Sequence, residues 1–372
     1  MVFSEPFLPK DDELILTTLT ENFENNELKI IKSLKVALNA DPKNQHLAYE
    51  LANAYAEIAR NQNDPRFYGL AEAVIKPWWF DGNDYSLIML KVRILQFNHQ
   101  FSEAIQVLNK MLQYHSDPQA LLIRASINQV LGKYDEVKSD CSKLAREANS
   151  LVISACFFSV NGFTSSAKET KKYILNLKNI INQSSDESVD VKIWAIGLAA
   201  ESASLTHDWI TAEELMLQGL RIKYDDDYLL SLYADLLLKQ KRYRECIDLL
   251  KPYSNQTSLL IRLLVAKNKL FVTKIQSQKQ KELDLRIRED FIKRDQRHLR
   301  EYAYYQLYVK KQYQSALQNA LINWESQKEM NDALILYGAA YHAQRDDVLE
   351  MIDEWAKKTQ IKIDFSTESL KI

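Results

Sequence analysis

Apolar residues recur along most of the chain at the three- and four-residue spacing of an amphipathic α-helix. Several segments share a finer pattern, in which apolar residues, some small and some large, stand at a first position and then three, four and seven positions later. The segments that show it most clearly are Ala48, Leu51, Ala52 and Tyr55; Leu230, Tyr233, Ala234 and Leu237; and Leu334, Tyr337, Gly338 and Tyr341. The pattern predicts helices that each bury one face against neighbouring helices.

A short polar turn signal followed by an aromatic residue also recurs, with a regular period. Phe101 and Tyr134 follow two such turns and are 33 residues apart, while Trp209 and Tyr243 are 34 residues apart. Tyr313 follows another turn of this kind. A period of 33 to 34 residues with one central turn indicates a helix–turn–helix unit that is used many times.

Small and large residues alternate in a second set of helices, which start at these aromatic residues. The pairs are Ala104 with Leu108, Ala212 with Met216, and Cys246 with Leu250. A small residue lets two helices approach closely, and a large neighbour fills the space beside it. One helix pair cannot bury its apolar face alone, so the pattern predicts stacked pairs.

These residues resemble the tetratricopeptide-repeat (TPR) family, whose repeat has the same period and the same small and large positions. Ala37 through Asp41-Pro42 is similar to the motif that closes a repeat of that family. The resemblance covers roughly residues 30–358. It implies an all-α, right-handed superhelical solenoid of about eight to nine TPR-like helix pairs.

Composition agrees with a helical chain and excludes other classes. Only 7 Gly and 7 Pro occur in 372 residues, which argues against a β-rich fold and against a Gly-rich nucleotide-binding fold. The 48 basic and 50 acidic residues give no overall attraction to nucleic acids or to anionic membranes. No run of apolar residues is long enough to predict a membrane span.

Changes in repeat spacing and polarity predict the domain organisation. The stretch from Gln183 to Asp190 is polar and rich in Ser, so a flexible division is expected there. We therefore expect an N-terminal segment at 1–29, an N-terminal TPR-like array at 30–183, a C-terminal array at 184–360 that contains an extended basic helix, and a tail at 361–372.

The resemblance implies a binding groove on the inner face, which the first helix of each pair would line. The partner would be a protein or peptide, and no small-molecule substrate is evident. Asn53 and Arg93 stand where members of the family often place side chains that bond a peptide backbone, but the paired Lys/Asn clamp for a terminal carboxylate is not matched. The groove positions implied are Tyr49, Asn53, Met89, Arg93, Leu122, Ser126, Gln129, Glu201, Asp235, Tyr305 and Tyr308.

No motif in the sequence indicates catalysis, a metal site or a cofactor. The six histidines are scattered over different repeats, and none stands four residues from another His or Cys. The nucleophile, phosphate-loop and zinc-protease motifs are absent from the sequence. We therefore expect a non-enzymatic protein without a cofactor.

The segment 267–300 offers an alternative function. It holds eleven basic and five acidic residues, and Leu283, Ile287 and Phe291 are expected to form the core face of its helix. A cytoplasmic adaptor could bind nucleic acid or an acidic protein there. Nucleic acid is the less favoured of the two, because the basic residues straddle a polar face that holds Asp284, Glu289 and Asp295 and do not gather into one stripe. The same pattern is typical of a solvated, salt-bridged helix with no partner.

The cysteines bear on the compartment. Cys141 and Cys156 are expected in adjacent antiparallel helices, within reach of a disulfide if their side chains face each other. Otherwise they and Cys246 are buried thiols of a cytoplasmic protein. The chain also loosely resembles exported TPR proteins of Gram-negative bacteria, through residues 5–9 and the cysteine positions. That resemblance implies a periplasmic protein whose leader has been removed.

Overall fold

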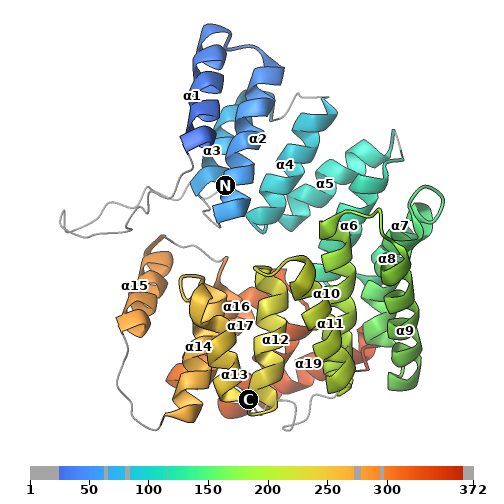
Figure 1. Cartoon of the computed structure of the whole chain (residues 1–372), viewed down its shortest axis with the longest axis vertical. Coiled ribbons are helices and arrows are strands. Elements are labelled where there is room, and N and C mark those ends of the chain that lie inside the picture. Colours follow the sequence, from blue (N-terminus) through green and yellow to red (C-terminus); the bar gives the residue numbers. More distant parts are fainter. Residues whose placement is uncertain are drawn as a thin grey trace. The chain divides into compact units, whose positions relative to one another are not determined.

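The computed structural model describes residues 25–62, 66–79, 84–114, 116–271, 278–293 and 297–362. Over these ranges the chain consists of helices and turns, without strands (Figure 1). It divides into two compact units, residues 1–120 and 121–372. None of the helices in the described ranges is long and apolar enough to cross a membrane.

The first unit packs its helices in chain order around a continuous apolar core. Leu51, Ala52 and Tyr55 lie in that core, as their spacing predicts, and the rings of Tyr68 and Phe97 stack with centroids 3.9 Å apart. The helices are α1 (Asn25–Ala40), α2 (Gln45–Gln62), α3 (Arg66–Ile75), the short 3-10 helix η1 (Lys76–Trp78), α4 (Tyr85–Phe97) and α5 (Phe101–Leu112).

The second unit continues the succession of helix pairs, and α6 crosses the boundary between the units. Its helices are α6 (Pro118–Val130), α7 (Tyr134–Leu144), α8 (Ser150–Thr164), α9 (Ala167–Gln183), α10 (Val189–Leu205), α11 (Trp209–Ile222), α12 (Asp227–Lys239), α13 (Tyr243–Leu250), η2 (Lys251–Tyr253), α14 (Thr257–Leu270), α15 (Gln278–Lys293), α16 (Leu299–Tyr305), η3 (Gln306–Lys310), α17 (Tyr313–Ser326), α18 (Met330–His342) and α19 (Asp346–Thr359). The predicted all-α helical-repeat fold is confirmed.

The turn inside the helix pairs has one backbone geometry that recurs six times in the described residues. The residue two positions before the second helix is left-handed each time; the six are His99, Gly132, His207, Lys241, Lys311 and Gln344. The next N–H usually donates to a carbonyl five residues earlier, as from Lys133 to Asn128 at 2.8 Å and from Arg242 to Leu237 at 2.8 Å. This wrap-around bond satisfies a carbonyl that the helix end would leave without a donor.

One of these turns differs, because η3 is a π-helix. The N–H of Gln312 donates to Gln306, six residues earlier, at 2.9 Å. A π-turn inserts one extra residue, so the side chains after it are rotated relative to an α-helical continuation. The insertion places Tyr308 in a π-helical turn beside the cavity described below.

Gly132 is the one glycine among these six left-handed residues, and an added methyl group there would have little room. A Cβ would lie 3.3 Å from Trp355 Nε1 and 3.4 Å from Lys328 Cβ. We expect Gly132→Ala to lower the free energy of unfolding by about 1–2 kcal/mol, because a left-handed conformation costs an L-residue about that much. Gly69→Ala is the matched control, because it lies in α3 with open space around it.

The control substitution, Gly69→Ala, should change the free energy of unfolding in the opposite direction. Alanine is favoured over glycine within a helix by about 0.5–1 kcal/mol, so Gly69→Ala should stabilise the chain. Urea unfolding of both variants measures the difference. Equal effects of the two substitutions would show that the left-handed turn does not constrain residue 132.

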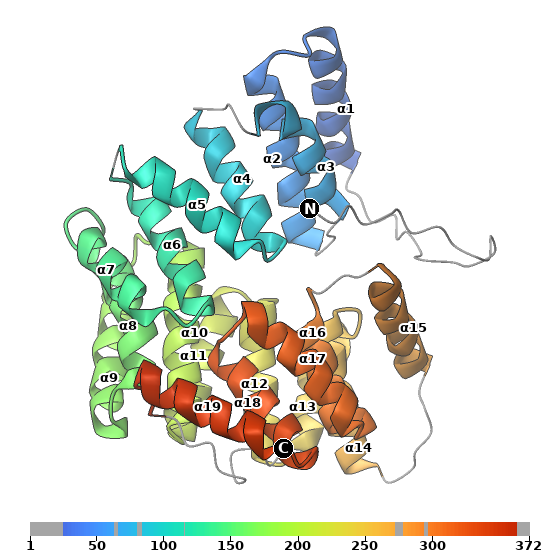
Figure 2. The same ribbon diagram turned by 180° about the vertical axis from the view of Figure 1, so that it is seen from behind.

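The second unit closes on itself, because its last helices contact its first ones. The N–H of Lys328, before α18, donates to the carbonyl of Val130 at the end of α6 at 2.7 Å. The N–H of Lys362, after α19, donates to Phe163 in α8 at 3.1 Å. Figure 2 shows this side of the second unit, with α18 and α19 next to earlier helices. The unit is therefore a closed turn of helix pairs.

The division between units does not coincide with the predicted one. The boundary at 120/121 lies in α6, whereas the polar stretch 183–190 lies inside the second unit, between α9 and α10, which pack against each other. A hinge at 183–190 stays a prediction. The N-terminal segment 1–29 and the tail 361–372 fall mostly outside the described residues, although α1 already begins at Asn25.

Candidate functional site

A cavity of about 300 Å³ lies in the second unit, on the side formed by the first helices of successive pairs. The helices α12, α14, α16 and α18 line it, together with η3. Its lining residues are Asp227, Tyr228, Ser231, Leu232, Asp235, Lys239, Ser258, Arg262, Arg300, Glu301, Tyr304, Tyr308, Asn331, Leu334 and Ile335. The wall thus combines apolar surface with three cations and three carboxylates.

Asp235 organises one side of this wall. Its two carboxylate oxygens accept hydrogen bonds from Arg262, from Nε at 2.9 Å and from Nη2 at 2.7 Å. The hydroxyl of Tyr304 also donates to Asp235, at 2.9 Å. The Arg262 guanidinium lies over the Tyr304 ring, 4.9 Å from its centroid, and the Tyr308 ring lies 4.6 Å from that of Tyr304. A bidentate pair of this kind fixes both planes, so this side of the wall is rigid.

Arg300 organises a second part of the wall. Its guanidinium donates to Asp332, with Nη2–Oδ2 at 2.9 Å, and to Glu329 and Gln327. Glu329 and Asp332 form the capping box that starts α18. The arginine therefore holds the start of α18 against α16.

Glu201 in α10 lies behind the wall and connects two of its residues. One carboxylate oxygen accepts from the Tyr228 hydroxyl at 2.8 Å, and the other accepts from the Asn331 amide at 3.0 Å. Burial raises the pKa of Glu201 to about 7, and the negative charge of Glu329 adds to the rise. The hydrogen bond from Tyr228 acts in the opposite direction. This carboxyl therefore changes charge near neutral pH.

We expect the second unit to lose stability as pH rises from 5 to 8. The pKa of Glu201 is about 7 in the folded chain and 4.5 ordinarily, so the folded state holds the proton more tightly and is favoured at low pH. From this group alone, the free energy of unfolding should fall by about 2 kcal/mol over that range. Glu201→Gln has no carboxyl proton at this position, so its free energy of unfolding should change less with pH.

Urea unfolding of the wild type and of Glu201→Gln at several pH values measures this effect. The other groups that interact with Glu201 are Glu329, Asp332, Arg300, Lys239, Tyr228 and Tyr134, and they are the same in both chains. The pH-dependent difference between the two chains therefore belongs to Glu201. Parallel curves for the two chains would contradict the raised pKa.

Within the second unit, the predicted groove residues do not form one cluster. Asp235 and Tyr308 line the cavity, and Glu201 touches it through Tyr228 and Asn331. Tyr305 is 1% exposed, and its hydroxyl donates to Asp284 in α15, so it packs between helices. The other positions predicted in this unit, Leu122, Ser126 and Gln129, lie in α6, outside the cavity lining.

The remaining groove positions lie in the first unit and form a small cluster there. Arg93 donates to Asn53 Oδ1 from Nη2 at 2.6 Å and to Glu57 Oε1 from Nη1 at 2.9 Å. Tyr49 and Met89 are partly buried on the same two helices. The two polar groups that were expected to bond a peptide are thus bonded to each other.

Sequence reasoning missed most of the residues that line the cavity, among them Lys239, Arg262, Arg300, Glu301 and Tyr304. Arg300 is the last residue of the basic segment 267–300, and the charge pattern of that segment does not distinguish it from its neighbours. Arg262 has a signal that could have been used: it is a lone arginine among apolar residues of α14, where a buried cation needs a carboxylate partner.

The basic segment does not form one helix in the described residues. It comprises the end of α14, the helix α15 and the start of α16, and the positions 272–277 and 294–296 lie outside the described ranges. Leu283 and Ile287 are buried as predicted, but Phe291 is 53% exposed, so the expectation that it faces the core was wrong. The core contact of α15 therefore ends before its last turns. Binding through this segment stays a prediction.

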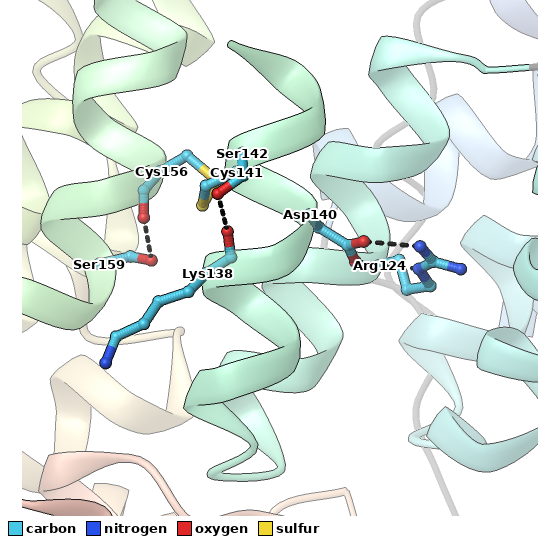
Figure 3. The surroundings of a disulfide bond; sticks show 7 residues. All are labelled: Arg124, Lys138, Asp140, Cys141, Ser142, Cys156 and Ser159. Carbon is cyan, nitrogen blue, oxygen red and sulfur yellow. Dashed lines mark hydrogen bonds and ion pairs between the residues drawn. A yellow bond between two sulfur atoms is a disulfide. The ribbon is translucent and has the colours of Figure 1, made fainter.

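Cys141 in α7 and Cys156 in α8 are joined by a disulfide, with their Cα atoms 5.6 Å apart (Figure 3). Asp140, also in α7, accepts hydrogen bonds from Arg124 of α6, from Nη2 at 2.6 Å and from Nε at 2.9 Å. The bond and the ion pair together tie α6, α7 and α8. Cys246 is a buried free thiol, and burial raises its pKa to about 12.

No protein-family model matches the sequence, and no curated protein matches it. Among solved structures, the chain is similar to the crystal structure of the P58(IPK) TPR domain, with 14% identity over 87% of this chain and 95% of that one. The TM-score is 0.21, so the superposition is poor. The fold assignment therefore rests on the helices and turns of this chain itself.

Proposed function

We propose that this protein is a non-enzymatic TPR-like scaffold, which binds a protein or peptide partner on the inner face of its second unit. The observation that carries the proposal is the cavity, because its lining comes from the first helices of successive pairs and includes charged side chains. Concave sites with a few fixed polar groups are where proteins ordinarily bind ligands.

The size of the cavity limits what enters it. About 300 Å³ is too small for a folded domain or a long peptide, so the partner would insert a side chain or a chain end and rest its remaining surface on the rim. The rigid Asp235–Arg262–Tyr304 arrangement supports this mode of binding, because a preformed wall loses little entropy when a partner binds.

We further propose that the protein functions in the bacterial cell envelope. The Cys141–Cys156 disulfide supports this placement, because disulfides persist in oxidising compartments such as the periplasm and are rare in the cytosol. The resemblance of the sequence to exported TPR proteins points in the same direction.

Site-directed photo-crosslinking in the native host tests the partner. A photoreactive amino acid replaces Ser231 in the cavity wall, and the matched control carries it at Ile210 of α11, which is 76% exposed. We expect one protein to crosslink from position 231 and not from position 210, and Lys239→Glu in the same chain to reduce its yield. Equal yields from both positions, or none from 231, would overturn the proposal.

A further inference from the structure

The three cations of the cavity wall differ in what they contact. Arg262 is bonded to Asp235, and Arg300 is bonded to Asp332 and Glu329. Lys239, the last residue of α12, has no hydrogen-bond acceptor and no ion-pair partner among the described residues. Burial lowers the pKa of its ammonium group, and the attraction of Asp235 and Glu201 only partly opposes this.

Two other polar groups of the same wall lack a partner within the described ranges. The Tyr308 hydroxyl makes no hydrogen bond, and burial raises the pKa of that hydroxyl. The Glu301 carboxylate makes neither a hydrogen bond nor an ion pair, although it faces Arg262 and Arg300 electrostatically. Lys239 and Glu301 therefore carry opposite charges in one cavity without pairing with each other.

A charge that loses water on burial is ordinarily paired, because an isolated one is costly to bury, and Lys239 is the group of this wall to which that applies. A purely anionic ligand would satisfy Lys239 but would meet the carboxylates of Glu301 and Asp227 in the wall. A purely cationic ligand would satisfy Glu301 but would meet Lys239. A ligand that carries both charges satisfies both ends, and a cavity of about 300 Å³ is at the small end of ligand pockets.

We infer that this cavity binds a small zwitterion, a free α-amino acid or a dipeptide, with its carboxylate at Lys239 and Tyr308 and its ammonium group at Glu301. This goes beyond the proposed partner function, because the ligand is a free molecule and needs no protein partner.

Isothermal titration calorimetry on the full chain tests the inference. The probes are free α-amino acids and dipeptides, each compared with its N-acetylated form, which has lost the positive charge, and with its C-terminal amide, which has lost the negative one. We expect at least one free form to bind, and its two blocked forms to bind about tenfold to hundredfold more weakly. Binding by amino acids but not dipeptides, or the reverse, identifies which zwitterion the cavity takes.

Matched substitutions locate the binding. Lys239→Met and Glu301→Gln should each weaken it by a similar factor of about ten to a hundred. The controls are Lys267→Met, in the last turn of α14, and Glu325→Gln in α17, which are exposed and should leave affinity unchanged. Circular dichroism verifies that each variant is folded.

No binding by any zwitterion would overturn the inference, as would equal binding of blocked and free forms or equal effects of the controls. The proposed scaffold function would survive these outcomes if the crosslink from position 231 persists. Conversely, if the crosslink were absent and a zwitterion still bound, the partner-binding proposal would be contradicted and the zwitterion site would be supported.

Discussion

Replacing Arg300 by methionine should destabilise the second unit by about 3–5 kcal/mol, which is the usual cost of removing one partner from a buried charge pair. Asp332 would lose its cation while its side chain stays 1% exposed, and Glu329 would lose the same contact. The start of α18 would then carry two uncompensated carboxylates. Urea or thermal unfolding of the full chain measures the loss.

Arg345→Met is the matched control, because Arg345 also pairs with an aspartate, Asp347, but on the exposed surface. We expect that substitution to leave stability unchanged, since exposed ion pairs contribute little. Arg300→Met combined with Asp332→Asn should recover part of the loss, because it removes one of the charges left behind. If Arg300→Met and Arg345→Met behaved alike, Arg300 would not hold α18.

Reducing the disulfide should lower the free energy of unfolding by about 3 kcal/mol. The cysteines are 15 residues apart in sequence, and closing a loop of that size restricts the unfolded chain by about that amount. Unfolding with and without a thiol reductant measures the effect. A chain with Cys141→Ala and Cys156→Ala should have the same free energy of unfolding with and without the reductant.

Thiol titration in denaturant without reductant gives a direct count for the same bond. With the disulfide formed, only Cys246 reacts, so we expect one thiol per chain. Three thiols would contradict the bond and would remove the main support for an oxidising compartment. Cys246→Ala is the control, because it should reduce the count to none while the reductant-dependent loss of stability remains.

The sequence predicted the helix pairs well because their signals are local. Six turns in the described residues have a left-handed residue two positions before the second helix, and most of these helices begin with an aromatic side chain that recurs at a near-constant period. The second helices begin at Phe101, Tyr134, Trp209, Tyr243 and Tyr313, the residues that the pattern identified. The turn at Gln306–Lys310 was not predicted, because a π-helical insertion leaves the apolar spacing almost unchanged.

The cavity could be predicted only in part, because it depends on which helices meet in space. Spacing places Asp235 and Tyr308 on inner faces, and both line the cavity. The same spacing gives Tyr305 an inner position, yet its side chain is buried and its hydroxyl donates a hydrogen bond to Asp284 of α15. Nothing local relates Glu201 to Asn331, which are 130 residues apart and share a hydrogen bond.

The closure of α6 and α8 onto α18 and α19 changes how the second unit must fold. An open row of repeats can grow by one pair at a time, since each pair contacts only its neighbours. Here the two ends stabilise each other, so the early pairs gain their full stability only after the last pair has been made. Loop closure over so long a stretch is slow, because its entropy must be lost before the contacts form. During synthesis, the surfaces of α6 and α8 that contact the last helices therefore stay exposed until residue 362 has left the ribosome.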